Sequence, residues 1–311
     1  MKRVFGACVF VLCVSPFAAT AQFSDWSTPV NLGSPPNSQY LDSCVAISKN
    51  GLSLFFSSNR QAPGTTNRDM YVSKRANVDD DWGSPQSIPA LNTAFFDSCP
   101  ALSLDEHRLY IASNRPGGCG VSEDLYVSRR HDRRDDLGWG PPVNLGCEAD
   151  GYVNSPYSDN TPTFFEDESG RVVMYFASSR GTGGVSRDIY QSVMRDDDTF
   201  GPATPVAELN SPYEDQGVTV RRDGLEVIFG SNRRSGGGVI SDFWVATRAS
   251  TADPWSAPVL VTSLGVPAYA GGRITLSFDG TEFYFASYRP GGYGLQDLYV
   301  ATRERLHGKK K

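Results

Sequence analysis

The chain has no excess of positive charge: 29 Lys and Arg residues stand against 35 Asp and Glu residues, which gives a formal net charge of -6. A protein of this sign has little electrostatic attraction for nucleic acid or anionic lipid, so we expect neither as a partner. Histidine is scarce as well, and the three residues His107, His131 and His307 lack the spacing of a zinc site. We therefore expect no zinc and no resident cofactor.

Long hydrophobic runs are also missing. The longest, Val4–Val14, is shorter than the roughly 20 residues that span a bilayer. It follows Lys2 and Arg3 and precedes the small residues Ala19-Thr-Ala21, a pattern typical of an export signal with its cleavage site. We expect residues 1–21 to be a signal peptide, no membrane span, and a protein that is periplasmic or secreted. Export permits disulfides among the four remaining cysteines.

Amphipathic stretches of helical period are absent, and the sequence instead repeats one unit five times. Each unit contains an aromatic residue followed by small residues and Pro, and these aromatic residues recur at intervals of 56, 57, 61 and 55 residues. They are Trp26, Trp82, Trp139, Phe200 and Trp255. Every unit also has a hairpin turn, an apolar run, an Arg, a loop, and an Asp followed by an apolar and an aromatic residue.

Four short antiparallel strands in a unit of this length describe one blade of a β-propeller. We predict an all-β fold, a five-bladed β-propeller of four-stranded antiparallel blades over residues 22–303, followed by a basic, disordered tail at residues 304–311. The propeller begins with fourth-strand sequence, Trp26–Leu32, and ends with third-strand sequence, Asp297–Arg303. The N-terminal strand should therefore complete the last blade and close the ring.

Two of the units resemble a known repeat. Residues 277–300, SFDGTEFYFASYRPGGYGLQDLYV, resemble the WD-40-like repeat of the TolB type, and residues 103–127 are similar to it. The resemblance extends over all five units. It implies a β-propeller in the periplasm or outside the cell, most often a binding or scaffolding module.

An Arg after the second strand and an Asp at the start of the third strand occur in every unit. A residue that every blade has is most simply structural, and Arg–carboxylate geometry suits an anchor for a loop. We interpret them as pairs within a blade that tie the second strand to the third. The pairs are Arg60 with Asp69, Arg115 with Asp124, Arg180 with Asp188, Arg233 with Asp242, and Arg289 with Asp297.

A second repeated set precedes the inner strand of each unit: Asn, Ser or Thr, any residue, an aromatic residue, any residue, and Asp. In a propeller this segment lies at the mouth of the central channel, and it predicts an acidic, aromatic-rimmed pocket for a sugar, a peptide or a metal ion such as calcium. The alternative is that the Asp side chains cap local turns. The fifth unit has Gly271 in place of the carboxylate, with an Arg two residues later. The candidate ligand-binding residues are Tyr40, Asp42, Phe95, Asp97, Tyr157, Asp159, Tyr213, Asp215, Tyr269 and Arg273.

The cysteines are placed by the same repeat. Cys119 lies between a second and a third strand, and Cys147 lies just past a fourth strand, so both should be on the mouth side and we predict a disulfide between them. Cys44 and Cys99 occupy equivalent positions in neighbouring units, and a bond there depends on their separation, which stays open.

Two functions fit these features. A rigid ring of variable loops suits recognition without chemistry, and we expect an exported, non-catalytic binding or scaffolding module for an envelope protein or an extracellular glycan. The alternative is a glycan-active enzyme, because five-bladed propellers also include arabinanase- and invertase-type glycoside hydrolases, which use two carboxylates across a funnel. In that case Asp97, Asp159 and Asp215, with Glu214 nearby, would supply the catalytic groups.

Overall fold

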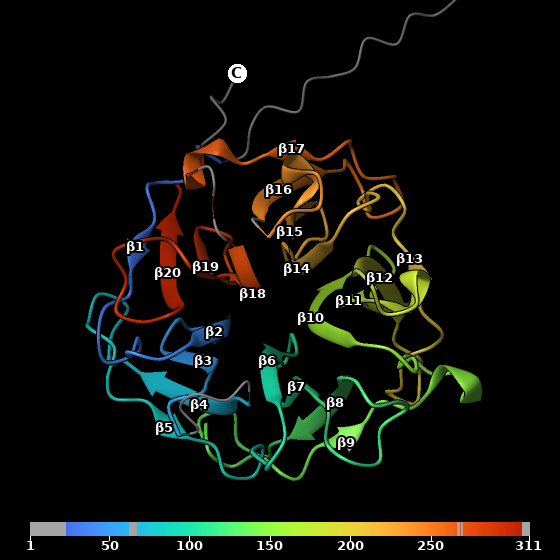
Figure 1. The fold of residues 1–311 in the computed structure, drawn as a ribbon, viewed down its shortest axis with the longest axis horizontal. Coiled ribbons are helices and arrows are strands. Elements are labelled where there is room, and N and C mark those ends of the chain that lie inside the picture. The colour runs from blue at the N-terminus through green and yellow to red at the C-terminus, as the bar shows by residue number, and fades with distance from the viewer. Residues whose placement is uncertain (1–22, 62–66, 240, 266–267, 269, 307–311) are drawn as a thin grey trace, which may run out of the picture.

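The computed structural model describes residues 23–61, 67–239, 241–265, 268 and 270–306, which form five four-stranded antiparallel sheets. Figure 1 shows the sheets as blades in a ring around a common centre, in chain order from blue to red. The predicted all-β, five-bladed propeller is confirmed. No helix in the described part of the chain is long and apolar enough to cross a membrane.

Each blade contributes one strand to each of four concentric positions (Figure 1). The inner strands are β2 (Asp42–Ile47), β6 (Asp97–Leu102), β10 (Asp159–Glu166), β14 (Asp215–Val220) and β18 (Ala270–Leu276). The second strands are β3 (Ser53–Ser58), β7 (Arg108–Ser113), β11 (Val172–Ser178), β15 (Glu226–Ser231) and β19 (Glu282–Ser287). The third strands are β4 (Asp69–Lys74), β8 (Asp124–Arg129), β12 (Asp188–Val193), β16 (Asp242–Thr247) and β20 (Asp297–Thr302). The outer strands are β5 (Gln86–Ser87), β9 (Val143–Asn144), β13 (Thr204–Pro205), β17 (Val259–Leu260) and β1 (Val30–Asn31).

Short 3₁₀ turns are the helical elements of the described residues. They are η1 (Glu148–Asp150), η2 (Arg180–Thr182), η3 (Arg233–Ser235) and η4 (Thr262–Leu264). We number the blades 1 to 5 from β2, so blade 5 consists of β18, β19, β20 and β1. The end of the ring at which the inner strands begin is called the mouth end. The end at which they turn into the second strands is called the hairpin end.

The N-terminal strand closes the ring, as predicted. In blade 5, Val30 of β1 pairs with Val300 of β20, and Asn31 pairs with Tyr299. Figure 1 shows β1 in blue beside β20 in red. The first and last strands of the propeller therefore share one sheet, and their hydrogen bonds hold the ring together.

The repeated aromatic residues pack between blades. All five are at most 8% exposed, and each contributes to a cluster with the preceding blade. Trp139 of blade 2, for example, meets Phe55 of blade 1 at a ring-centroid distance of 6.2 Å. Because a blade is covered by neighbours on both faces, strands such as β3 are buried along their whole length.

Every inner strand carries a bulge. Two residues in blades 1 to 4 lie between the two paired stretches, opposite one residue of the second strand. The first bulge residue has positive φ, which costs little only for Gly. These residues are Cys44, Cys99, Thr161, Gly217 and Gly272.

Blade 5 has one residue more in its bulge. There, Gly272, Arg273 and Ile274 all lie between the pairs Gly271–Ala286 and Thr275–Tyr284. This corrects the sequence alignment of that unit. Ala270, and not Gly271, faces the end of the second strand as the Asp residues do in blades 1 to 4.

Candidate active site at the mouth end

Four repeated carboxylates begin the inner strands at the mouth end, and all are fully buried. They are Asp42, Asp97, Asp159 and Asp215, each 0% exposed. In blade 2, Arg115 donates from Nη2 to Oδ1 of Asp97 over 2.6 Å, and Ser113 donates its hydroxyl to the same oxygen over 2.6 Å. The N–H and hydroxyl of Thr93 donate to Oδ2 of Asp97 over 2.7 and 2.6 Å. Both carboxylate oxygens are thus fully engaged.

The other three blades repeat this ion pair. The pairs are Arg60–Asp42 at 2.8 Å, Arg180–Asp159 at 2.8 Å and Arg233–Asp215 at 2.6 Å. The partner of each repeated Arg therefore differs from the one expected from the sequence. Ser113, at the end of the second strand, stands opposite both Asp97 and Asp124, so the register alone does not select the partner. Arg115 reaches Asp97, whereas Asp124 is bound by the N–H of Cys119 and the side chain of Asn144.

The repeated Asp residues of the third strands anchor loops in other ways. Asp124 accepts hydrogen bonds from the N–H of Cys119 over 2.6 Å and from Nδ2 of Asn144 over 2.9 Å. Asp242 pairs with Arg234 at 2.6 Å, and Asp297 accepts a bond from Nδ2 of Asn31 over 3.0 Å. Burial raises the pKa of Asp69, Asp124 and Asp188, and the inner Asp of the following blade raises it further.

Blade 5 departs from this scheme. Arg289 donates to the carbonyls of Leu264 and Ala268, at 3.2 and 3.4 Å, and burial lowers its pKa. Arg273 does not lie at the rim of the mouth. It is 4% exposed and donates to the carbonyls of Pro162 and Val45. Tyr269 lies outside the described residues.

The other predicted aromatic residues form a rim. Phe95, Tyr157 and Tyr213 are 41%, 39% and 37% exposed, and Tyr40 is half-buried. Each stands two residues before the start of an inner strand, around the mouth. Partly exposed rings at such a place are suited to stacking on the faces of sugars.

Two glutamates at the mouth are only half-buried. Glu123 precedes β8, and its Oε2 accepts a hydrogen bond of 2.6 Å from the hydroxyl of Ser158. Glu214 precedes β14 and pairs through Oε1 with Nη1 of Arg187 at 2.8 Å, with both side chains 28% exposed. Nη2 of Arg187 also reaches the hydroxyl of Ser158, at 3.5 Å. The network joins carboxylates from blades 2 and 4 through residues of blade 3.

Some buried polar atoms at the mouth have no partner among the described residues. They are the side-chain amide of Gln296 and Oδ1 of Asn160, whose Nδ2 donates to the hydroxyl of Ser158. Gln296 precedes β20 as Glu123 precedes β8, and Asn160 is the second residue of its inner strand. Buried amides without partners are rare, and ligand hydroxyls would satisfy them.

The repeat contains a signal for Glu123 and Arg187, two members of this network that were not among the predicted site residues. The position just before the third-strand Asp varies between blades, although two blades have Arg there. The residues at this position are Arg68, Glu123, Arg187, Ser241 and Gln296. The Asp beside it is the same in all five blades. A position that varies between blades is not needed for the fold of every blade and can therefore contact a ligand. The Asp that follows it in all five blades is needed for the fold.

Two disulfides are present. The structure contains the predicted bond between Cys119 and Cys147, with a Cα–Cα distance of 5.5 Å. It also joins Cys44 and Cys99, at a Cα–Cα distance of 4.6 Å, and so links the bulges of neighbouring inner strands. The N–H of Arg273 donates to the sulfur of Cys44. With the bonds from the Arg273 guanidinium to the carbonyls of Pro162 and Val45, these residues join the inner strands of blades 1, 2, 3 and 5.

The described residues contain no group of three or more His, Cys, Asp or Glu side chains placed to hold a metal ion. The four inner carboxylates are each held by their own Arg, so they do not converge. Of the three ligand classes considered for the mouth, the metal ion therefore has no ligand set in the described part of the chain.

Comparison with known proteins gives matches in structure alone. No family model matches the chain, and no curated protein matches its sequence. An α-L-arabinofuranosidase from Lactobacillus brevis matches with a TM-score of 0.59 and 14% identity, over 89% of this chain and 94% of that one. An endo-arabinase from Bacteroides thetaiotaomicron matches with a TM-score of 0.55 and 15% identity, over 92% of this chain and 100% of that one. At these identities the likeness shows the fold.

These matches correct the expectation of a non-catalytic binding module. A putative TolB from Agrobacterium tumefaciens is also among the similar structures, with a TM-score of 0.46 and 14% identity over 86% of this chain and 91% of that one. Several of the similar propellers are described as arabinofuranosidases, as an endo-arabinase or as glycoside hydrolases.

Proposed function

We propose that this protein is a glycan-active enzyme of the glycoside hydrolase type and that its reaction takes place at the mouth end. The observation that carries the proposal is the network of Glu123, Ser158, Arg187 and Glu214. It brings two accessible carboxylates from different blades to one side of the ring centre.

Glycosidic bond cleavage needs two carboxyl groups with different tasks. One protonates the leaving oxygen, and the other acts as a base toward water or as a nucleophile toward the anomeric carbon. Glu214, which pairs with Arg187, and Glu123, whose carboxylate accepts a hydrogen bond from the hydroxyl of Ser158, are the two groups that would share these tasks.

We do not assign these tasks to Asp97, Asp159 and Asp215. Each is 0% exposed, and its carboxylate is bound by an Arg and by a Ser or Thr. A substrate would have to break an ion pair and a turn to reach them. Their geometry supports the turn-capping alternative, with the Arg pair in addition.

Substrate recognition would use the rim and the amide atoms that lack a partner in the described residues. Tyr157 and Tyr213 offer ring faces to sugars, Gln296 offers a donor and an acceptor to hydroxyls, and Asn160 offers its Oδ1 as an acceptor. We also propose that the protein works in the periplasm or outside the cell. Its two disulfides are consistent with an oxidising compartment.

The test is release of sugar from a panel of polysaccharides by the purified protein. The panel includes arabinan and arabinoxylan, because several of the similar propellers are described as arabinofuranosidases or as an endo-arabinase. We expect Glu123→Gln and Glu214→Gln each to lower the rate by about 10²- to 10⁴-fold, the usual size of general acid–base catalysis.

The matched control is Glu304→Gln, which removes an exposed carboxylate beyond the end of β20, away from the mouth. It should retain the full rate. A panel without any sugar release by folded protein, or release that is the same in the two mouth variants, would contradict the proposal.

A further inference from the structure

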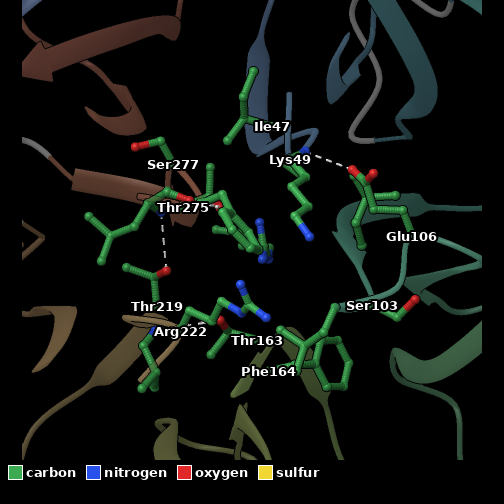
Figure 2. Close-up of a pocket in the computed structure, with 17 residues that line it drawn as sticks. Ile47, Lys49, Ser103, Glu106, Thr163, Phe164, Thr219, Arg222, Thr275 and Ser277 are labelled. Carbon is green, nitrogen blue, oxygen red and sulfur yellow. Dashed lines mark hydrogen bonds between the residues drawn. The ribbon is translucent and has the colours of Figure 1, made fainter. Parts of the chain in front are cut away.

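A cavity opens at the hairpin end, on the side of the ring opposite the mouth. Its volume is about 90 Å³, several times the roughly 10–15 Å³ that a single water molecule requires. Thr163, Thr219 and Thr275, which occupy the same register position in three inner strands, line it with Phe164. Figure 2 shows Lys49 and Arg222 extending into it from different blades.

Arg273 lines the cavity from the ring centre. It is the extra residue that the longer bulge of blade 5 permits. Its guanidinium donates from Nε to the carbonyl of Pro162 over 2.8 Å and from Nη1 to the carbonyl of Val45 over 2.6 Å. No carboxylate of the described residues pairs with it, although a buried cation is costly without an anion. Burial alone lowers the pKa of Arg273 to about 9, so it stays charged at neutral pH.

Lys49 and Arg222 add two more cations at the tips of the hairpins of blades 1 and 4. Both lie over the ring of Phe278, with Nζ of Lys49 4.2 Å and Cζ of Arg222 4.1 Å from its centroid. No salt bridge to either side chain occurs within the described residues. The one carboxylate that lines the cavity, Glu106, accepts a hydrogen bond from the backbone N–H of Lys49 over 2.7 Å (Figure 2).

We propose that the hairpin end is an anion-binding site for a phosphate or sulfate group, held by Lys49, Arg222 and Arg273. Three cations from three blades converge on a cavity of suitable size, and hydroxyls of the lining threonines can donate to the remaining oxygens of the anion. A tetrahedral oxyanion uses donors from several directions, which matches side chains arranged around a ring.

The site is independent of the proposed reaction at the mouth. The Cys44–Cys99 disulfide and the Arg273 bulge lie between the two ends, and the mouth glutamates do not line the cavity. An anion here would therefore neutralise the buried guanidinium of Arg273 and stabilise the ring without contacting the glycan.

The test uses the full protein and measures its melting temperature in inorganic phosphate, inorganic sulfate or glucose 6-phosphate, each against sodium chloride of equal ionic strength. An anion that binds only the folded state raises the melting temperature with its concentration. We expect inorganic phosphate and sulfate to do so beyond chloride. A rise with glucose 6-phosphate as well would identify a phosphate ester as an acceptable ligand, and a rise with the free anions alone would restrict the site to them.

Lys49→Gln and Arg222→Gln should each weaken phosphate binding about tenfold, the effect of losing one charge-assisted hydrogen bond. The control, Arg129→Gln, removes an exposed Arg at the end of β8, outside the cavity, and should leave the binding unchanged. Because Arg273 also holds two carbonyls, the test does not depend on replacing it. The proposal would be overturned if phosphate raised the melting temperature no more than chloride does, or if phosphate raised it equally in all three variants.

Discussion

The two ends of the ring differ in whether their charged side chains have partners of opposite charge. At the mouth end, four buried Asp residues are each neutralised by an Arg of the same blade. At the hairpin end, Lys49, Arg222 and Arg273 converge on a cavity, and none of them pairs with a carboxylate of the described residues. The repeated Asp residues of the mouth end are thus neutralised within the fold, whereas the three cations of the hairpin-end cavity have no carboxylate partner among the described residues.

The same rule separates residues within the mouth. Asp97 and its counterparts recur in four blades and are engaged on both oxygens, as in the bonds from Arg115 and Thr93. Glu123 and Glu214 have no such counterparts and remain half-buried. In a repeat protein, therefore, the departures from the repeat are better candidates for chemistry than the repeat itself.

The largest effect should follow from breaking an ion pair at the mouth. Asp159→Ala leaves the guanidinium of Arg180, which is 11% exposed, without its buried partner. We expect a loss of about 3–5 kcal/mol in the free energy of unfolding, measured with urea. Asp79→Ala, on an exposed loop, should cost less than about 0.5 kcal/mol. Equal stability of the two variants would show that the repeated Asp residues do not hold the fold.

A somewhat smaller effect should follow from removing the disulfide on the mouth side. Cys119 and Cys147 are 28 residues apart, and a closed loop of that length contributes about 3–4 kcal/mol in the chain-entropy account. We expect Cys119→Ser/Cys147→Ser to lower the free energy of unfolding by that amount without reductant. Urea unfolding that coincides with the native curve would mean that this bond does not constrain the chain.

The smallest effect is expected at the hairpin end. Lys49 and Arg222 lie within about 4 Å of the same ring and have no acidic partner in the described chain, so their removal breaks no ion pair. In phosphate-free buffer, Lys49→Gln/Arg222→Gln should lower the free energy of unfolding by no more than about 1–2 kcal/mol, the usual contribution of two exposed cation–π contacts. A loss of about 3 kcal/mol or more, as expected for a broken buried ion pair, would place these cations among the structural charges and remove the contrast between the ends.

The sequence predicted the architecture because the repeat carries it. The spacing of the aromatic residues fixed the number of blades, and the frame of the repeat predicted the closure by β1. The partners of the repeated Arg residues could not be predicted in the same way. In blades 1 to 4 one Asp begins the inner strand and another begins the third strand. The end of the second strand stands opposite both, as Ser113 does with Asp97 and Asp124, so only the side-chain contacts distinguish them.

The candidate site was less accessible to sequence reasoning. The bulge of blade 5 contains one extra residue, so counting from the aromatic residue placed Gly271 where the structure has Ala270. Neither Glu123 nor the cavity beside Arg273 follows from a pattern in one unit. Each depends on side chains from several blades that meet only when the ring is closed.

The most direct test of the central claim is sugar release by Glu123→Gln/Glu214→Gln compared with native protein and with Glu304→Gln. The melting temperatures of the three proteins are measured first, to show that the variants are folded as stably as the native protein. The account predicts that native protein and Glu304→Gln release sugar from at least one polysaccharide at similar rates, and that the double variant does not. Release by the double variant at the native rate would contradict the assignment of catalysis to the half-buried glutamates of the mouth end.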